Sequence, residues 1–311
     1  MLETRFKVAL FLAVLLLTAM PVVGILKGTR QPPIGESSEE SSQARDDASV
    51  RASGSDVPRS DDMVLIPVGA FTRGTTAGGY DELPQRQIYL DAYRIDRYEV
   101  TNHQYQGFVM ATGHRKAAPP SRYAKNLTAM RGVNQPAVYV SWDDADAYCR
   151  WKGKRLPTEA EWEKAMRGND GRLWPWGNDP DPLGANWASA KDQYEFTAPG
   201  GSFSRDISIY KVADGAGNVM EWVADWYAED AYRDAQDRNP KGPDHGIYKV
   251  LRGGGYTSTG KDVRITSRSR MVPDFRDETI GFRCAISEGQ MGVGDSLHDR
   301  RKTTGNQSSR E

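Results

Sequence analysis

Residues 155–167 read RLPTEAEWEKAMR, and this stretch carries a complete helix signal. Thr158 can cap the helix N-terminus, and Glu161 stands three residues later, where the partner in a capping box belongs. Trp162 and Ala165 then follow at helical spacing and predict one buried face. We therefore expect a short helix that begins at Thr158 and packs against the core of a domain.

Two more helices are expected before this stretch. Thr101 and Gln104 form a second capping-box pair, and Gly113 would end that helix. Ser141 caps the other helix, which would end near Gly153. Brief strands are expected at 63–68, 88–100, 248–251 and 281–285. Because regular elements are few and of both kinds, the pattern predicts an α+β fold with much irregular backbone.

The polar ends of the chain bound this domain. Residues 27–62 and 288–311 are rich in charged and small polar residues and nearly lack large apolar ones, so we expect a disordered linker and a disordered tail. Between them lie residues 63–287, a length that suits one domain.

The N-terminal residues 1–26 predict a membrane segment. Arg5 and Lys7 precede residues 8–26, a run of 19 residues without a charge that is long enough to cross a bilayer as a helix. We expect an uncleaved signal anchor, because the small-residue cleavage site at 22–24 (VVG) is poor. The domain would then lie in the periplasm or another extracytoplasmic space. The alternative is secretion after cleavage of this segment.

Charge and cysteine content exclude several classes of protein. Among 311 residues, 41 Lys and Arg balance 42 Asp and Glu, so bulk positive charge does not favour a nucleic-acid binder. The two cysteines, Cys149 and Cys284, are too few for a cysteine-rich zinc site. The four histidines lie far apart, without metal-ligand spacing.

Two oxygen-rich clusters suit a hard cation such as calcium. The first oxygen cluster is Asn186, Trp187, Asp192 and Tyr194, and the second is Asp214, Gly217, Val219 and Glu221. In the second, two carboxylates flank a glycine turn that can aim carbonyl groups inward. The alternative is that these acids only cap turns and helix ends.

Five short blocks, taken in order, carry a family resemblance. They are RLPTEAEWE at 155–163, WPWGN at 174–178, GNVMEW at 217–222, RGGG at 252–255 and GFRC at 281–284. Their order resembles that of the formylglycine-generating enzymes, also called sulfatase-modifying factors, over essentially all of residues 63–287. The resemblance implies a single compact domain with little regular secondary structure, related to C-type lectins.

The resemblance also implies two structural calcium ions and one disulfide. Each oxygen cluster would hold one ion through two side chains, with the backbone carbonyls of Trp187, Tyr194, Gly217 and Val219 as further ligands. Family members that carry both cysteines bridge the positions of Cys149 and Cys284. The alternative is two buried thiols, which a cytoplasmic location would favour.

The copper site of the family has no counterpart here. The enzymes hold copper(I) through two cysteine thiolates, which match Ser258 and Val263 in this chain. Neither side chain can hold copper(I), and residues 256–264 contain no cysteine. The family's oxidation of a substrate cysteine to formylglycine is therefore not expected.

Three functions remain open. The first is a non-oxidase binding or maturation factor whose groove holds a peptide, a glycan or a small molecule. The groove residues would be Ser258, Arg264, Arg268 and Arg270, with the arginines suited to anionic groups; a solvated strand edge is the alternative reading of these arginines. The second is an enzyme of altered mechanism, related to oxidative tailoring or protein modification. The third is an accessory subunit that docks a membrane-bound protein.

Overall fold

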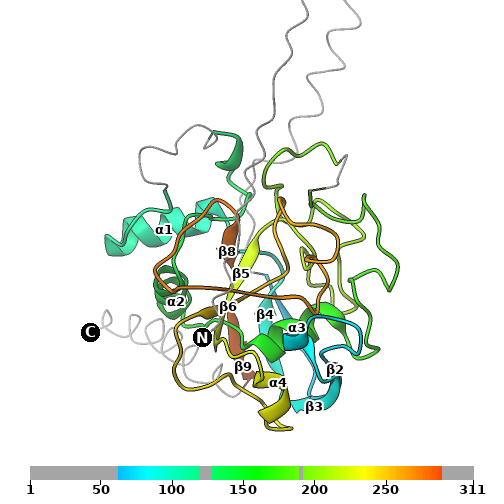
Figure 1. The fold of residues 1–311 in the computed structure, drawn as a ribbon. Helices are drawn as coiled ribbons and strands as arrows, with labels where there is room; N and C mark the ends of the chain where they lie inside the picture. The colour runs from blue at the N-terminus through cyan, green and yellow to red at the C-terminus, as the bar shows by residue number, and fades with distance from the viewer. Residues whose placement is uncertain (1–61, 119–127, 189–191, 289–311) are drawn as a thin grey trace, which may run out of the picture. The chain divides into compact units, whose positions relative to one another are not determined.

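A computed structural model describes residues 62–118, 128–188 and 192–288 (Figure 1). The predicted anchor at 1–26, nearly all of the predicted linker and the tail from residue 289 lie outside the described residues. Within the described ranges, no helix has the length and apolar character needed to cross a bilayer.

The strands form three small sheets. One is antiparallel, with the order β1 (Met63–Ile66), β4 (Tyr93–Asp96) and β9 (Ala285–Ser287). A second pairs β2 (Gly69–Arg73) with β3 (Arg86–Leu90). The third has the order β7 (Arg268–Met271), β6 (Lys249–Arg252), β5 (Met220–Trp226) and β8 (Ile280–Phe282), and in it β5 and β8 run parallel.

The helices begin where the capping residues predict. The three long ones are α1 (Asn102–Thr112), α2 (Trp142–Trp151) and α3 (Glu159–Arg167), and the short ones are α4 (Ala231–Asp234) and the 3₁₀ turn η1 (Tyr80–Glu82). A complete capping box opens each long helix, at Thr101, Ser141 and Thr158. Gly113 takes the left-handed conformation, with φ of 72°, and ends α1 as predicted.

Several strands differ from the sequence-based expectation. The strand expected at 63–68 ends at Ile66, and a second strand starts at Gly69. The stretch 88–100 supplies only the end of β3 and all of β4. The strand expected at 281–285 is divided between β8 and β9, and three strands, β2, β5 and β7, were not predicted. In β5, Met220, Trp222 and Ala224 pack on one face, whereas the other face carries Val223 and the buried carboxylates of Glu221 and Asp225.

Two hydrophobic clusters lie on opposite faces of the central strands. Trp222 of β5 packs in the cluster that also contains residues of α1 and α2, while its neighbour Val223 packs in the cluster with residues of α3. Val250 and Leu251 of β6 divide in the same way. Successive strand residues face opposite sides, so β5 and β6 carry the two halves of the core.

One disulfide lies in the cluster that contains residues of α1 and α2. It joins Cys149 of α2 to Cys284, which lies between β8 and β9, with the two Cα atoms 5.6 Å apart. Both residues are fully buried. The pairing implied by the family resemblance is therefore present in the structure.

Candidate functional site

The second oxygen cluster lies in a tight loop that leads into β5. Asp214 and Asn218 both have φ of 60°, and Gly217 has φ of 105°. A Cβ atom on Gly217 would lie 2.0 Å from the carbonyl oxygen of Asn186, so this position requires glycine. The loop therefore holds Asp214 and Glu221, both almost completely buried, in a fixed arrangement.

Two further buried carboxylates, which sequence reasoning missed, influence this loop. They are Glu99 and Asp206, each 2% exposed. Burial and the nearby Asp214 raise the pKa of Asp206 to about 8. Burial, Asp214 and Glu221 raise the pKa of Glu99 well above its ordinary value. The physical cause is an excess of negative charge in a region of low dielectric constant.

Arg283 compensates part of this charge. Its Nε lies 2.7 Å from Glu221 Oε2 and its Nη2 lies 2.7 Å from Oε1, so the pair is bidentate. The indole of Trp162 donates a further hydrogen bond to Glu221 at 2.9 Å. In the described part of the chain, no three His, Cys, Asp or Glu side chains form a preformed metal-binding group. A cation in this cluster would therefore depend on backbone carbonyls as well as on Asp214 and Glu221.

The first oxygen cluster contains a buried acceptor atom that lacks a partner. Oδ1 of Asp192 accepts a hydrogen bond from the backbone N–H of Tyr194 at 3.0 Å, but Oδ2 of Asp192 is buried and has no hydrogen-bond partner among the described residues. Asn186 donates through Nδ2 to the carbonyl of Phe196, at 2.9 Å, and to Oδ1 of Asn218, at 3.2 Å. Because a buried carboxylate oxygen without a donor is costly, the donor set fits a bound cation.

Asn218 connects the two oxygen clusters. Its Nδ2 donates to both carboxylate oxygens of Glu99 at 3.0 Å, and its Oδ1 accepts from Asn186 and from the backbone N–H of Ala198. Its backbone N–H donates to the carbonyl of Asn186 at 2.8 Å. One buried amide side chain therefore joins Asn186 of the first cluster to the loop of the second.

The structure places the two copper-matching positions in different environments. Ser258 is partly exposed, and its Oγ accepts a hydrogen bond from the backbone N–H of Gly255 at 3.0 Å. Val263 is 1% exposed and packs in a small hydrophobic cluster with Trp174 and Trp187. The first position thus makes a local turn contact, and the second belongs to the core.

The three arginines of the predicted groove also lie in different environments. Arg264 forms a bidentate pair with Glu82, at 2.9 and 3.1 Å. The prediction is wrong for Arg268, which lies inside the protein and not at the surface of a groove, because its guanidinium pairs with the buried Glu159. Arg270 is exposed and lies 4.5 Å from the ring centre of Tyr227. Of the three arginines that were predicted to contact an anionic ligand, Arg270 is therefore the most accessible to solvent.

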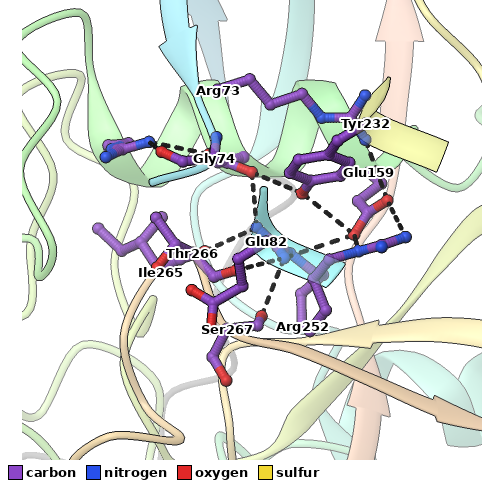
Figure 2. A network of polar contacts seen from close by, with 12 residues as sticks. Arg73, Gly74, Glu82, Glu159, Tyr232, Arg252, Ile265, Thr266 and Ser267 are labelled. Atoms are coloured by element: carbon purple, nitrogen blue, oxygen red, sulfur yellow. Dashed lines mark hydrogen bonds and ion pairs between the residues drawn. The ribbon is translucent and has the colours of Figure 1, made fainter. Parts of the chain in front are cut away.

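Arg268 belongs to a buried network of charges at the N-terminus of α3, part of which Figure 2 shows. Glu159 contacts Arg73 at 3.0 Å and Arg268 at 2.7 Å, while Glu163 contacts Arg252 at 2.9 Å. The ring of Tyr232 lies under the guanidinium of Arg73. The members come from β2, α3, α4, β6 and β7. The sequence did contain a signal for this network, because Glu159 and Glu163 are four residues apart and therefore share one face of α3.

The comparisons with known proteins agree with this architecture. The model of the sulfatase-modifying factor enzyme 1-like domain matches residues 50–288. This chain therefore belongs to the family of formylglycine-generating enzymes and their relatives, and it has the α+β fold of that family.

Two proteins and one solved structure illustrate what this chain is similar to. A formylglycine-generating enzyme from Bos taurus is 34% identical, with 72% of this chain and 74% of that protein covered. The inactive Cα-formylglycine-generating enzyme 2 of Mus musculus is 32% identical, with 73% and 86% covered. The solved structure of PvdO from Pseudomonas aeruginosa is 29% identical with a TM-score of 0.65, and the match covers 76% of this chain and all of that one.

Proposed function

We propose that this chain is a non-oxidase member of its family, a binding or maturation factor held outside the cytoplasm by residues 8–26. The observation that carries the proposal is the lack of a thiol pair for copper(I). The sequence has two cysteines, and both are used in the disulfide between Cys149 and Cys284. Ser258 and Val263 stand at the copper-matching positions.

Two further observations support this function. Val263 is packed in the core, so even a ligand-bearing side chain there would need a rearranged loop to reach an exposed site. A relative of similar identity bears the name of an inactive formylglycine-generating enzyme. The ligand of the factor would be a peptide, a glycan or a small molecule, contacted at Ser258, Arg264 and Arg270.

A copper(I) competition tests the loss of the oxidase site. The purified domain is titrated into the complex of copper(I) with the chromogenic chelator bathocuproine disulfonate, and the visible absorbance is followed. We expect the absorbance to stay constant, because soft thiolates are what copper(I) requires. The Bos taurus enzyme serves as the positive control. Removal of one equivalent of copper(I) by the native protein would contradict the proposal.

Calcium is the cofactor that the two oxygen clusters would hold. Asn186 and Asp192 would supply the side chains of one site, and Asp214 and Glu221 those of the other, with backbone carbonyls completing both. A bound cation would use the unpartnered oxygen of Asp192 and would offset the excess negative charge beside Asp214. Its role would be structural, because it would hold irregular loops that have few ladder hydrogen bonds of their own.

We expect terbium, a luminescent substitute for calcium, to bind the calcium-free protein and to emit when tryptophan is excited. Trp187 belongs to the first cluster, so its indole can sensitise a nearby ion. EGTA should lower the melting temperature, because an ion present at about a hundred times its Kd stabilises the fold by about 2.7 kcal/mol. Asp192→Asn should reduce the sensitised emission, whereas Asp170→Asn, on an exposed loop, should not. Emission that calcium cannot displace would argue against these sites.

A further inference from the structure

A cavity of about 850 Å³ lies between α2, the start of α3, the end of β5 and the loop that follows residue 238. Its walls include Trp142, Asp146, Arg150, Arg155, Trp226 and Lys249. Of the described residues that line it, none belongs to the oxygen clusters or to the groove residues. Its volume is within the range of small-molecule sites, about 300–1,000 Å³.

Two half-buried tryptophans form the aromatic part of the cavity. The indole N–H of Trp142 donates to the carbonyl of Val223 at 2.8 Å. The ammonium group of Lys249 lies 3.9 Å from the ring centre of Trp142 and 4.0 Å from that of Trp226, and it donates to the carbonyl of Ala224 at 2.8 Å. This buried cation therefore covers one face of each ring and fixes both rings in place, so a ligand would pack on the parts of the two rings that line the cavity.

The charged groups of the wall are already compensated within the protein. Arg155 pairs with both oxygens of Glu161 at 2.7 Å. Arg150 pairs with Asp146 at 2.9 Å. Asp225, almost fully buried, accepts hydrogen bonds from the backbone N–H groups of Glu159 and Gly242. An ionic ligand would therefore have to compete with these internal partners.

The same pairs still offer hydrogen bonds to neutral groups. A carboxylate has about four acceptor positions and a guanidinium has five N–H donors, and an ion pair uses only some of them. At the exposed rim, Lys241 and Asp244 have opposite charges, and the other two lining carboxylates, Asp91 and Glu288, pair with Arg238 and Arg94. The wall thus presents both donors and acceptors beside the two aromatic rings.

We propose that this cavity binds a short uncharged saccharide. A pyranose ring has one face of C–H groups, which would pack on the part of Trp142 or Trp226 that lines the cavity, and a border of hydroxyls, which both donate and accept. The hydroxyls would bind the Asp146–Arg150 and Arg155–Glu161 pairs without breaking them. This site is separate from the groove at Ser258 and Arg270, so it does not depend on the proposed function.

The test uses three uncharged trisaccharides, chitotriose, cellotriose and maltotriose, and the charged trigalacturonate. Binding to the purified protein is followed by calorimetry and by tryptophan fluorescence. We expect at least one uncharged trisaccharide to bind, and Trp226→Ala to weaken it by about tenfold or more, equivalent to about 1.4 kcal/mol. Trp151→Ala is the matched control, because this tryptophan of α2 is 43% exposed and does not line the cavity; it should leave the affinity unchanged.

A second variant keeps the test informative if Trp226→Ala does not fold. Asp146 pairs with Arg150 one helical turn away on the surface of α2, so Asp146→Ala should fold and should also weaken binding. Three results would overturn the proposal: no uncharged trisaccharide binds at millimolar concentration, binding is indifferent to both variants, or trigalacturonate binds more tightly than every uncharged sugar.

Discussion

Replacing Cys149 and Cys284 with alanine should lower the free energy of unfolding by about 5 kcal/mol, because the disulfide closes a loop with a sequence separation of 135 residues. A bridge of this span restricts the unfolded chain strongly. For a domain of this size, such a loss corresponds to a fall in melting temperature of about 10–20 °C. Urea unfolding followed by tryptophan fluorescence measures the change.

The control for this prediction is the native protein under reducing conditions. Both cysteines are fully buried in the cluster that contains α1 and α2, so the alanine variant also loses some packing. Reduction removes the bridge but keeps both sulfur atoms, and it should reproduce most of the loss. If the reduced and oxidised proteins were equally stable, the bridge would have no stabilising role. A stable bridge also suits an oxidising compartment.

Glu159→Gln is expected to destabilise the protein by about 3–5 kcal/mol. The carboxylate of Glu159 is buried against Arg73 and Arg268, and Arg252 lies 3.4 Å away. Removing its charge leaves Arg73 and Arg268 without their ion-pair partner inside the protein, whereas Arg252 keeps its pair with Glu163. Asp170→Asn is the matched control: its exposed pair with Arg172 should contribute less than about 1 kcal/mol.

The pH dependence of stability offers a second readout for Glu159. Burial would raise its pKa, but Arg268, Arg252 and Arg73 outweigh burial and lower the pKa to about 2. A carboxyl group whose pKa is lower in the folded state stabilises the fold above its unfolded pKa, about 4.3. This stabilising contribution is lost as the pH falls from about 4.3 toward 2. The free energy of unfolding of Glu159→Gln should therefore fall less than that of the native protein over the same pH interval. A variant as stable as the native protein at neutral pH would contradict this role.

The helices could be predicted because their signals are local. Thr101, Ser141 and Thr158 cap the three long helices, and each capping box is complete within four residues of sequence. The strands were harder. The central strand β5 is defined by its neighbours β6 and β8, which lie more than 20 residues away in sequence, and its apolar residues serve both faces.

Some features of the candidate sites could also be predicted from the sequence, and others could not. The lack of thiols at Ser258 and Val263 follows from the sequence directly, and the disulfide followed from the family resemblance. The partners of a charged side chain depend on tertiary structure, so the burial of Arg268 against Glu159 could not be predicted from the sequence. The cavity that contains Trp142 and Trp226 was equally hidden, because its walls come from segments that are distant in sequence.

The most direct measurement of the central claim is an oxidation assay. A peptide that carries the sulfatase-type cysteine is incubated with the purified protein, copper(I) and oxygen, and its mass is followed by mass spectrometry, with the Bos taurus enzyme as the positive control. With Ser258 and Val263 at the copper-matching positions, we expect no conversion of the peptide cysteine to formylglycine. Conversion to the formylglycine aldehyde by this protein would contradict the claim that it is a non-oxidase.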